Sequence, residues 1–280
     1  MRVLVTGTSG RIGSAVAKRL ALNAEVIGID ILPGKYTNYV GDITNRRFLD
    51  DVVHDVYAVV HCAAYHAPHV GVIDNSKFRD VNVRGTENLI NKALSTNVNR
   101  FVYTSTTSIY GCTTLPKKEA VWVTEQLSPN PEDIYDETKL IAEELCYGAA
   151  QNGLNTIVLR MSRCFPEADH LMVFYRLYRG VSKEDVAEAH LLAAQSELKG
   201  FHIFNISSLS PFIEEECQLL LNGPWSVIDR KFPNAKGLFS KAGWQIPNSI
   251  DRVYVIEKAI KMLNYQPIRN FEYILLKKKG

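Results

Sequence analysis

The sequence lacks the cysteine patterns that stabilise small secreted proteins or bind zinc. Its five cysteines are odd in number and scattered, and no two of them form a C-x-x-C motif. This pattern argues against a disulfide framework, a zinc site or dithiol redox chemistry. We therefore expect reduced, mostly buried thiols and a cytoplasmic protein. The five are Cys62, Cys112, Cys146, Cys164 and Cys217.

The sequence also has little excess of either positive or negative charge, and it has no long apolar run. The 32 Lys and Arg against 30 Asp and Glu leave a formal net charge of +2, and we expect the basic cluster Lys277–Lys279 to be a solvated tail. This balance predicts no nucleic-acid partner. No apolar run approaches the length of a membrane span, and Met1–Gly7 has neither a basic leader nor a small-residue cleavage site. We expect neither membrane association nor export.

What the sequence does contain is a regular alternation of short apolar runs and segments of helical period. Such alternation predicts an α/β protein whose parallel sheet is covered by helices, and 280 residues fit one continuous body of this kind. The expected strands are Val3–Thr6, Glu25–Asp30, Ala58–Cys62, Arg100–Ser105 and Thr156–Met161, and the expected helices are Arg11–Leu22, Arg46–Val53, Ile73–Ser95 and Ile134–Ala150.

After about residue 161, strand-like and helix-like segments no longer alternate regularly, and several prolines interrupt the chain. We interpret residues 1–160 as the sheet-forming core and residues 161–280 as a small substrate-binding lobe. The second segment is expected to return one last strand to the core, at about residues 201–207. Helical spacing is present at Lys183–Ala194 and Ile250–Leu263.

A glycine-rich loop follows the first strand. Gly7, Gly10 and Gly13 lie in T-G-T-S-G-R-I-G, which also contains Arg11 and Ile12 and opens the first helix. Glycines in this setting let the backbone approach a pyrophosphate, which then rests on the N-terminus of the helix. The loop therefore predicts dinucleotide binding on a doubly wound sheet of the Rossmann type.

The acidic residue at the end of the second strand bears on the choice of cofactor. Asp30 stands 17 residues after Gly13, near the spacing at which a carboxylate meets the adenosine ribose. It accepts hydrogen bonds from ribose hydroxyls and repels a 2′-phosphate, which favours NAD over NADP. Arg11 is the counter-argument because a guanidinium suits a phosphate, and Asp30 as a mere turn former is the alternative.

Tyr135 and Lys139 stand at i and i+4 at the start of an expected helix, so both side chains share one face. A tyrosine titrates near 10 in water, and nearby positive charge is needed for it to act as an acid or base at neutral pH. Taken alone, such a pair is usually an ordinary surface feature. In this chain the pair is evidence for an active site because further motifs accompany it.

Residues 1–207 resemble the extended short-chain dehydrogenase/reductase family of NAD-dependent epimerases and dehydratases. The resemblance rests on the glycine loop, the Tyr135/Lys139 pair and four further motifs in the family's order, at residues 41–44, 61–64, 82–86 and 104–111. For the cofactor, the resemblance implies that Asp42 and Ile43 contact the adenine, that Ala63 and Ala64 lie beside the cofactor and that Ser105 lines the nicotinamide pocket. For the reaction, it implies that Thr106 binds the reacting oxygen of the substrate, that Tyr135 is the acid/base and that Lys139 binds the ribose. It also implies a homodimer formed through helices 73–95 and 134–150.

The motifs also indicate which reactions of the family are expected of this chain. Family dehydratases follow the catalytic Thr with Asp and Glu, whereas this chain has Thr107 and Ser108. The resemblance therefore favours an epimerase or a dehydrogenase acting on a secondary alcohol of a sugar or sugar nucleotide. Asp136 stands where the family usually has a small residue, and the sequence gives no reason for it.

Besides Thr106, three further side chains are expected to recognise the substrate. The segment Arg160–Asp185 is much shorter than in nucleotide-sugar epimerases and resembles that of uronate dehydrogenases. Arg163 and Arg179 are candidates for binding a substrate carboxylate or phosphate, and His66 follows the cofactor-contacting alanines. His66 and His69 lack a third ligand, so no metal is expected. A non-catalytic NAD-sensing protein on the same fold remains the alternative of a different class.

Overall fold

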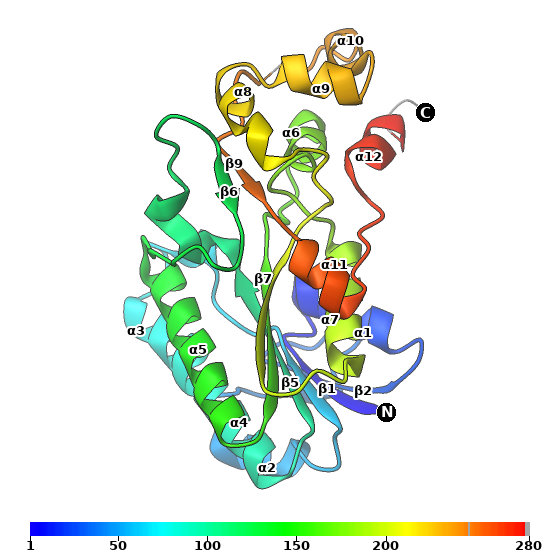
Figure 1. The fold of residues 1–280 in the computed structure, drawn as a ribbon. Helices are drawn as coiled ribbons and strands as arrows, with labels where there is room; N and C mark the ends of the chain where they lie inside the picture. The colour runs from blue at the N-terminus through cyan, green and yellow to red at the C-terminus, as the bar shows by residue number, and fades with distance from the viewer. Residues whose placement is uncertain (246, 278–280) are drawn as a thin grey trace.

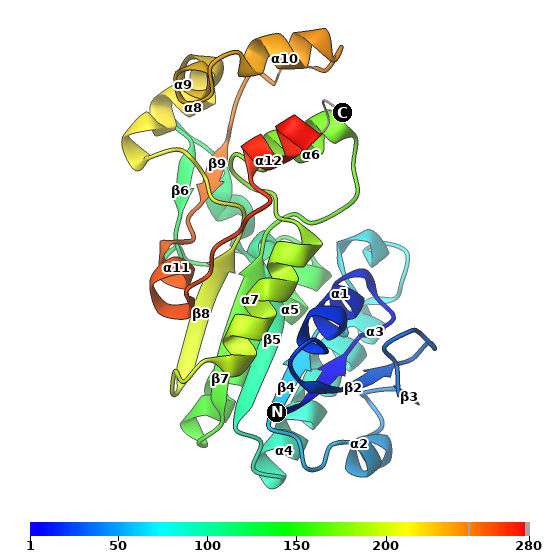
Figure 2. The same ribbon diagram turned by 90° about the vertical axis from the view of Figure 1, so that its right-hand side faces the viewer.

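A computed structural model of the protein describes residues 1–245 and 247–277, so Lys278 and Lys279 of the basic cluster lie outside the described residues. Its centre is a seven-stranded sheet in which every neighbouring pair is parallel, in the order β3-β2-β1-β4-β5-β7-β8 (Figures 1 and 2). The strands are β1 (Arg2–Thr6), β2 (Glu25–Asp30), β3 (Tyr39–Val40), β4 (Ala58–His61), β5 (Arg100–Thr106), β7 (Asn155–Met161) and β8 (Phe201–Ile206).

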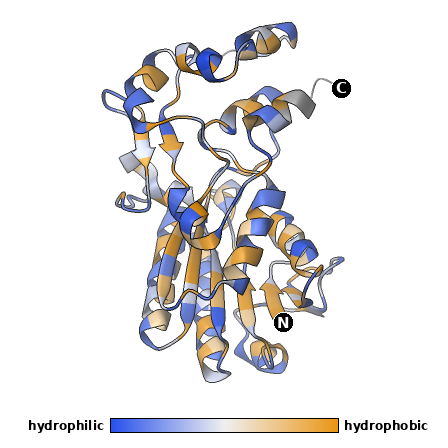
Figure 3. Cartoon of the chain, turned by 45° about the vertical axis from the view of Figure 1, so that its right-hand side comes forward, coloured by the Kyte–Doolittle hydropathy of each residue, from blue (hydrophilic) through white to orange (hydrophobic). Residues whose placement is uncertain are grey.

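The central strands are apolar because both of their faces are covered. Every residue of β4 and β5 is buried, and Figure 3 shows hydrophobic colour running through the sheet. This is the pattern expected of a parallel sheet between two helical layers. The strand order turns back between β1 and β4, which places a crevice for a ligand at the carboxyl ends of these strands.

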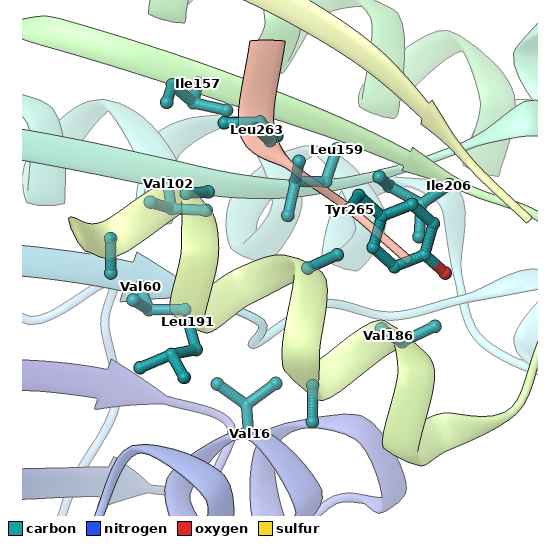
Figure 4. Close-up of a cluster of buried hydrophobic side chains, with 14 of the residues drawn as sticks. Val16, Val60, Val102, Ile157, Leu159, Val186, Leu191, Ile206, Leu263 and Tyr265 are labelled. Carbon is teal, nitrogen blue, oxygen red and sulfur yellow. The ribbon is translucent and has the colours of Figure 1, made fainter. Parts of the chain in front are cut away.

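Three helices cover one face of the sheet: α1 (Arg11–Leu20), α7 (Lys183–Gln195) and α11 (Glu257–Leu263). Their apolar side chains meet those of the strands in a continuous cluster that includes Val16, Leu191, Leu159 and Leu263 (Figure 4). Each fully buried aliphatic side chain of this kind contributes roughly 1.5–3 kcal/mol to folding. The cluster fixes α1 and α7 side by side with their N-termini near the same edge of the sheet (Figure 2).

The opposite face carries α2 (Arg46–Val52), α4 (Thr86–Ser95) and α5 (Ile134–Gln151). Before α4 lie the short helix α3 (Asn75–Phe78) and a π-helical segment, η2 (Arg79–Gly85). The single helix expected at Ile73–Ser95 is therefore interrupted by π geometry. The strong N-cap of α5, where the Asp133 carboxylate accepts from Asp136 N, fixes the start of the helix that carries Tyr135.

A lobe stands above the carboxyl ends of the strands (Figure 1). Its core is aromatic, with Phe174 and Phe239 packed on Trp225. It comprises the two-stranded sheet β6 (Val121–Val123) and β9 (Arg252–Tyr254), the helices α6 (Asp169–Tyr175), α8 (Cys217–Asn222), α9 (Trp225–Lys231), α10 (Ala235–Lys241) and α12 (Phe271–Lys277), and the 3-10 segment η4 (Glu214–Glu216). Two further 3-10 segments, η1 (Ala67–His69) and η3 (Thr107–Thr114), follow β4 and β5.

The structure confirms the predicted fold class, a doubly wound parallel α/β sheet. One predicted helix is wrong: Ile250–Leu263 begins as strand β9, and only Glu257–Leu263 is helical. Its apolar spacing suits a helix, but pairing with Val121–Val123 takes precedence. The division at residue 160 stays a prediction, although α7 and β8 pack on the first segment and β6 joins the lobe. Among the described helices, none has the length and apolar character of a membrane span.

Candidate active site

The glycine loop has the close packing that its sequence predicts. Gly7 has a φ of +75°, and a Cβ atom there would lie 2.8 Å from Ala63 N. A Cβ on Gly13 would lie only 2.0 Å from Gly7 O, and one on Gly10 would lie 3.2 Å from it. Side chains at these positions would separate the loop from β4 and from α1. The glycines thus let the loop lie against the first turn of α1, where backbone N–H groups can receive a pyrophosphate.

Asp30 holds the loop from the end of β2. Its Oδ2 accepts from Ser9 N at 2.9 Å, and its Oδ1 accepts from Leu32 N at 3.0 Å. Each carboxylate oxygen keeps a second lone pair, so the group can still accept from ribose hydroxyls. Further along this edge, Asp42 is exposed and its Oδ1 accepts from Thr44 N, while Ile43 is buried.

Arg11 points away from Asp30. Its Nε donates to Cys164 O at 3.1 Å, beyond the end of β7, and β7 lies on the other side of β1 from β2. The guanidinium is therefore not placed beside the ribose position at Asp30, and the counter-argument for NADP loses its geometric basis. Ile12 packs against the core beneath the loop.

A hydrogen-bonded chain positions the backbone after β4. Thr6 Oγ1 accepts from Cys62 N at 3.1 Å and Ala63 N at 3.0 Å, and pairs with His61 Nδ1 at 2.7 Å. Burial, followed by the charge of Lys139, lowers the pKa of His61 to about 3, so its ring is neutral. The backbone of Ala63 is thereby held against the glycine loop, and Ala64 follows it in the chain.

The structure brings the three predicted catalytic residues together at the carboxyl end of β5. Thr106 ends the strand, and Tyr135 lies on the first turn of α5, close enough for the threonine hydroxyl to lower the pKa of the phenol. One turn later, the Lys139 Nζ donates to Thr104 O at 2.7 Å and lies 4.7 Å from the centre of the Tyr103 ring. The i and i+4 spacing therefore directs both side chains of α5 towards β5.

Burial opposes ionisation of both residues. It raises the pKa of Tyr135, an effect that the hydrogen bond from Thr106 reduces and the Asp136 and Asp133 carboxylates increase. Burial also lowers the pKa of Lys139 to about 8, although Cys62 and Glu143 counteract part of this change. Tyr135 therefore needs additional positive charge before it can act as a base near neutral pH.

Asn82 is a site residue that the sequence motifs contain but did not single out. Its Oδ1 accepts from Tyr65 N at 2.8 Å, and its Nδ2 donates to Tyr65 O at 3.0 Å and Thr138 Oγ1 at 3.1 Å. It lies in the π-helical segment, a geometry enriched at functional sites. Asn82 thus ties the loop after β4 to α5 next to Lys139.

Ser105 makes a contact that sequence analysis did not anticipate. Its hydroxyl donates to Glu143 Oε1 at 2.6 Å, and the same carboxylate receives Arg160 Nη2 at 2.6 Å. Arg160 Nη1 also donates to Tyr110 Oη at 3.0 Å, and all four residues are buried. The Ser105 side chain is therefore engaged with α5, and a role in the nicotinamide pocket stays a prediction.

At positions 107 and 108, where family dehydratases have Asp and Glu, a carboxylate reaches Ser108 from Asp136 of α5. Ser108 Oγ donates to Asp136 Oδ1 at 2.5 Å and lies 3.0 Å from Thr106 Oγ1. Thr107 and Ser108 themselves supply no carboxylate, as the sequence shows. Asp136 is thus connected to Thr106 through Ser108.

The predicted substrate residues form a partly basic wall at the same edge. Arg163 and Arg179 are brought together by a backbone bridge, and their guanidinium groups lie 5.7 Å and 4.8 Å from the centre of the Tyr175 ring. Arg163 Nη2 also pairs with Glu167 at 2.6 Å, and Arg179 Nη1 lies 4.0 Å from Asp251 Oδ2. Neither arginine is therefore an isolated cation. The wall continues through the Phe165 ring, 5.4 Å from Arg163, to the His66 ring.

A cavity of about 320 Å³ lies beside the N-termini of α1 and α7. Four basic side chains dominate its lining, and Glu184 is the acidic one. Arg176 is 9% exposed, and its Nε has no hydrogen-bond partner in the described part of the chain. The positive flank favours an anionic ligand near the loop. The basic residues are Arg11, Arg176, Lys183 and Arg269.

Comparison with known proteins decides the family. The model of the NAD dependent epimerase/dehydratase family matches residues 3–171, more than half of the chain. The chain belongs to this family. The match confirms the predicted resemblance, and the family's name includes the predicted cofactor, NAD.

Individual relatives of the family span different substrates. The 3-beta-hydroxysteroid dehydrogenase of Mycolicibacterium neoaurum is 32% identical over 194 residues, covering 64% of this chain and 52% of that protein. The UDP-glucose 4-epimerase of Rhizobium meliloti is 34% identical over 170 residues, covering 56% and 50%. The chain thus spans about half the length of these curated relatives.

Solved structures agree with the fold along the whole chain. The UDP-N-acetylglucosamine 4-epimerase of Bacillus cereus has a TM-score of 0.70 at 25% identity and covers 100% of both chains. A short-chain dehydrogenase/reductase protein of Agrobacterium tumefaciens with bound NAD has a TM-score of 0.73 at 21% identity, covering 99% and 95%. The second likeness shows the fold alone.

Proposed function

We propose that the protein is an NAD-dependent epimerase or oxidoreductase acting on a secondary alcohol of a sugar or sugar-derived substrate. The observation that carries the proposal is the meeting of Thr106, Tyr135 and Lys139 at the carboxyl end of β5, on the same edge of the parallel sheet as the glycine loop that follows β1. Family membership supports the cofactor, and the site supports the chemistry. Bound NAD supplies a hydride acceptor and a positive charge on its nicotinamide ring.

The loop and its neighbours fit a dinucleotide. Gly7 and Gly13 let the loop pack closely on Ala63 and on the first turn of α1, whose backbone N–H groups would receive the pyrophosphate, and Arg11 adds positive charge at this end of α1. Asp30 would accept from the adenosine ribose, which favours NAD. Asp42 and Ile43 would meet the adenine, and Ala63, Ala64 and Ser105 would line the nicotinamide half.

Tyr135 acts as the acid/base in this proposal. In alcohol oxidation its phenolate takes the hydroxyl proton while Thr106 fixes the oxygen of the substrate. Lys139 would hold the nicotinamide ribose, and its positive charge would favour the phenolate. The raised pKa of Tyr135 is compatible with this role only when cofactor and lysine charges act together, because burial alone keeps the phenol protonated.

The wall of His66, Arg163 and Arg179 supports an anionic substrate. Two guanidinium groups around one tyrosine ring suit a carboxylate or a phosphate, even though each also has an acidic neighbour. The short Arg160–Asp185 segment favours a uronate-type sugar-acid dehydrogenase as the second candidate. Epimerisation and net oxidation share the same hydride step, so the site supports both.

Replacing Tyr135 by Phe tests the proposal. Tyr135→Phe removes the proton acceptor and keeps the ring, so turnover should fall by at least roughly a hundredfold while the NAD affinity stays within about threefold. Activity is followed by NADH absorbance and sugar NMR, and affinity by quenching of tryptophan fluorescence. Wild-type activity in the variant would remove Tyr135 from the mechanism. The exposed Tyr147→Phe on the same helix is the matched control.

A further inference from the structure

Arg176 is a nearly buried guanidinium without an acidic partner. It follows α6 directly and is 9% exposed, and its Nε has no hydrogen-bond partner in the described part of the chain. The ion pairs found among residues 1–245 and 247–277 do not include it. Burial lowers the pKa of Arg176. A buried cation without a counter-charge is costly, which indicates an anion that the chain itself does not supply.

The nearby carboxylate of Asp185 is committed to other groups. Its Oδ2 accepts from the Ser182 hydroxyl at 2.8 Å and from Arg269 N at 3.1 Å, and its Oδ1 accepts from Ile268 N at 3.1 Å. These bonds tie the first turn of α7 to the segment before α12. The charge of Asp185 acts on Arg176 from a distance, but the two residues form no ion pair in the described part of the chain.

Arg176 lines the cavity of about 320 Å³ beside the N-termini of α1 and α7. Three further cations, Arg11, Lys183 and Arg269, line it against Glu184 alone, so the lining has a formal charge of +3. Arg269 Nε lies 3.8 Å from Glu184 Oε2, and these two charges largely offset each other. The positive charge of the cavity therefore comes mainly from the other three cations.

The N-terminus of α7 adds backbone donors on one side of the cavity. Ser182 is the N-cap, and its Oγ accepts from Asp185 N at 2.9 Å. The first N–H groups of a helix have no acceptor within the helix and favour an anion. Glu184 and Asp185 in the first turn offset part of this potential. The buried guanidinium of Arg176 is the feature that distinguishes the cavity from an ordinary helix terminus.

The cavity lies beside the path expected for the cofactor. The predicted cofactor residues follow the carboxyl ends of β2, β1, β4 and β5. Among them Arg11 alone lines the cavity, and its Nε donates to Cys164 O, beyond the end of β7. The other lining residues belong to α7, to the chain after α6 and to the region of α12. Figure 2 shows α6 and α12 above α1 and α7.

We propose that this cavity is a second ligand site that binds a phosphate group through Arg176, Lys183 and Arg11. The oxygens of a phosphate suit both a guanidinium fork and an ammonium group. The volume is near the lower end of small-molecule sites, so it leaves room for a small organic group beside the phosphate. The inference goes beyond the proposed function and does not depend on it.

Thermal unfolding of the cofactor-free protein tests the site with inorganic phosphate as the probe. A ligand that binds only the folded state raises Tm. Phosphate at several times its Kd should raise the Tm of the wild type by about 2–4 °C relative to potassium chloride of equal ionic strength. Line broadening in ³¹P NMR gives the Kd. A wild type without a phosphate-dependent Tm shift would overturn the proposal.

Arg176→Met removes the charge and keeps an unbranched apolar side chain. The variant should raise the Kd for phosphate by roughly tenfold or more and remove the Tm shift. In chloride alone its Tm should equal or exceed that of the wild type, because an unpaired buried cation is lost. Arg47→Met, at an exposed position of α2, is the matched control and should keep the wild-type Kd.

Lys183→Gln is the second cavity variant, and it keeps the test decisive if Arg176→Met does not fold. It should raise the Kd by roughly threefold or more, whereas the control Lys117→Gln, at an exposed position outside the cavity, should leave it unchanged. Wild-type phosphate affinity in both cavity variants would contradict the assignment of the site.

A titration with NAD present distinguishes this site from the pyrophosphate position at the glycine loop. A separate site should keep its Kd for phosphate within about threefold when NAD is saturating. A rise of roughly tenfold or more would place the anion in the cofactor site and overturn the proposal. A protein that fails to bind NAD would count against the proposed function but leave the phosphate titration intact. Glucose 1-phosphate as a second probe shows whether a phosphate monoester binds as tightly as the free anion.

Discussion

Asp136 and Lys139 lie on neighbouring turns of α5, and burial moves their pKa values in opposite directions. For Asp136 the folded state has the higher pKa and holds the proton more tightly than the unfolded chain. Its contribution to stability is therefore present at low pH and is lost as the pH rises through its folded pKa. Asp136→Asn should raise the melting temperature relative to wild type, and more so at about pH 8 than at about pH 4. A difference independent of pH would contradict this account.

Single residues also show how far sequence reasoning reaches. Tyr135 and Lys139 are found from local spacing, because i and i+4 on a helix always share a face. Asn82 lies within one of the motifs, but its hydrogen bonds to Tyr65 and Thr138 join residues that are distant in the chain, so the sequence alone does not predict them. Asp136 could not be interpreted, since its partner Ser108 stands 28 residues away and only the docking of η3 against α5 brings them together. The cofactor and substrate assignments of the remaining site residues stay predictions.

At the scale of elements, the glycine loop is the most constrained connection. Gly13→Ala places a Cβ 2.0 Å from Gly7 O, so the loop or α1 must move. We expect a loss of roughly 1–3 kcal/mol in the free energy of unfolding, with a large loss of NAD affinity. Calorimetry and fluorescence titration measure the two effects.

Gly148→Ala is the matched control for the loop variant. Gly148 lies within α5, and a Cβ there meets nothing within 4 Å. Replacing a mid-helix glycine by alanine should stabilise the protein by about 0.5–1 kcal/mol and leave NAD binding unchanged. Equal losses in both variants would mean that the loop geometry does not govern cofactor binding.

Element prediction succeeded where local pattern and tertiary pairing agree. Strand Phe201–Ile206 matches β8, and the other expected core strands fall within a residue or so of those observed. It failed for Ile250–Leu263, where apolar residues at helical intervals conceal a strand. Strand β9 pairs with Val121–Val123, which lies more than a hundred residues earlier in the chain, and no local sequence pattern predicts that pairing.

At the scale of the whole molecule, a buried polar network joins the core to the lobe. The Glu143–Arg160 pair contacts Tyr110, whose hydroxyl donates to Asn205 Oδ1 at 2.8 Å, and Asn205 Nδ2 donates to Val123 O in β6. Glu143→Gln leaves Arg160 buried without its carboxylate and should cost about 3–5 kcal/mol in the free energy of unfolding.

Chemical denaturation measures this loss, with an exposed ion pair as the control. Glu257 and Lys261 are 66% and 72% exposed, so Glu257→Gln should change stability by less than about 1 kcal/mol. Equal effects in the two variants would show that the buried network does not hold the core and lobe together.

The oligomeric state of the molecule is a proposal. We propose a homodimer formed through the outer faces of the helical segments 73–95 and 134–150, which light scattering on the pure protein tests directly.

The most direct test of the central claim is one reaction series, with purified protein, NAD and a panel of hexuronic acids, free sugars and nucleotide sugars. The account predicts either growth of NADH absorbance with one class of substrate, which identifies a dehydrogenase, or a changed sugar by NMR without NADH, which identifies an epimerase. A protein that binds NAD yet changes no member of the panel would contradict the account and favour a non-catalytic NAD sensor.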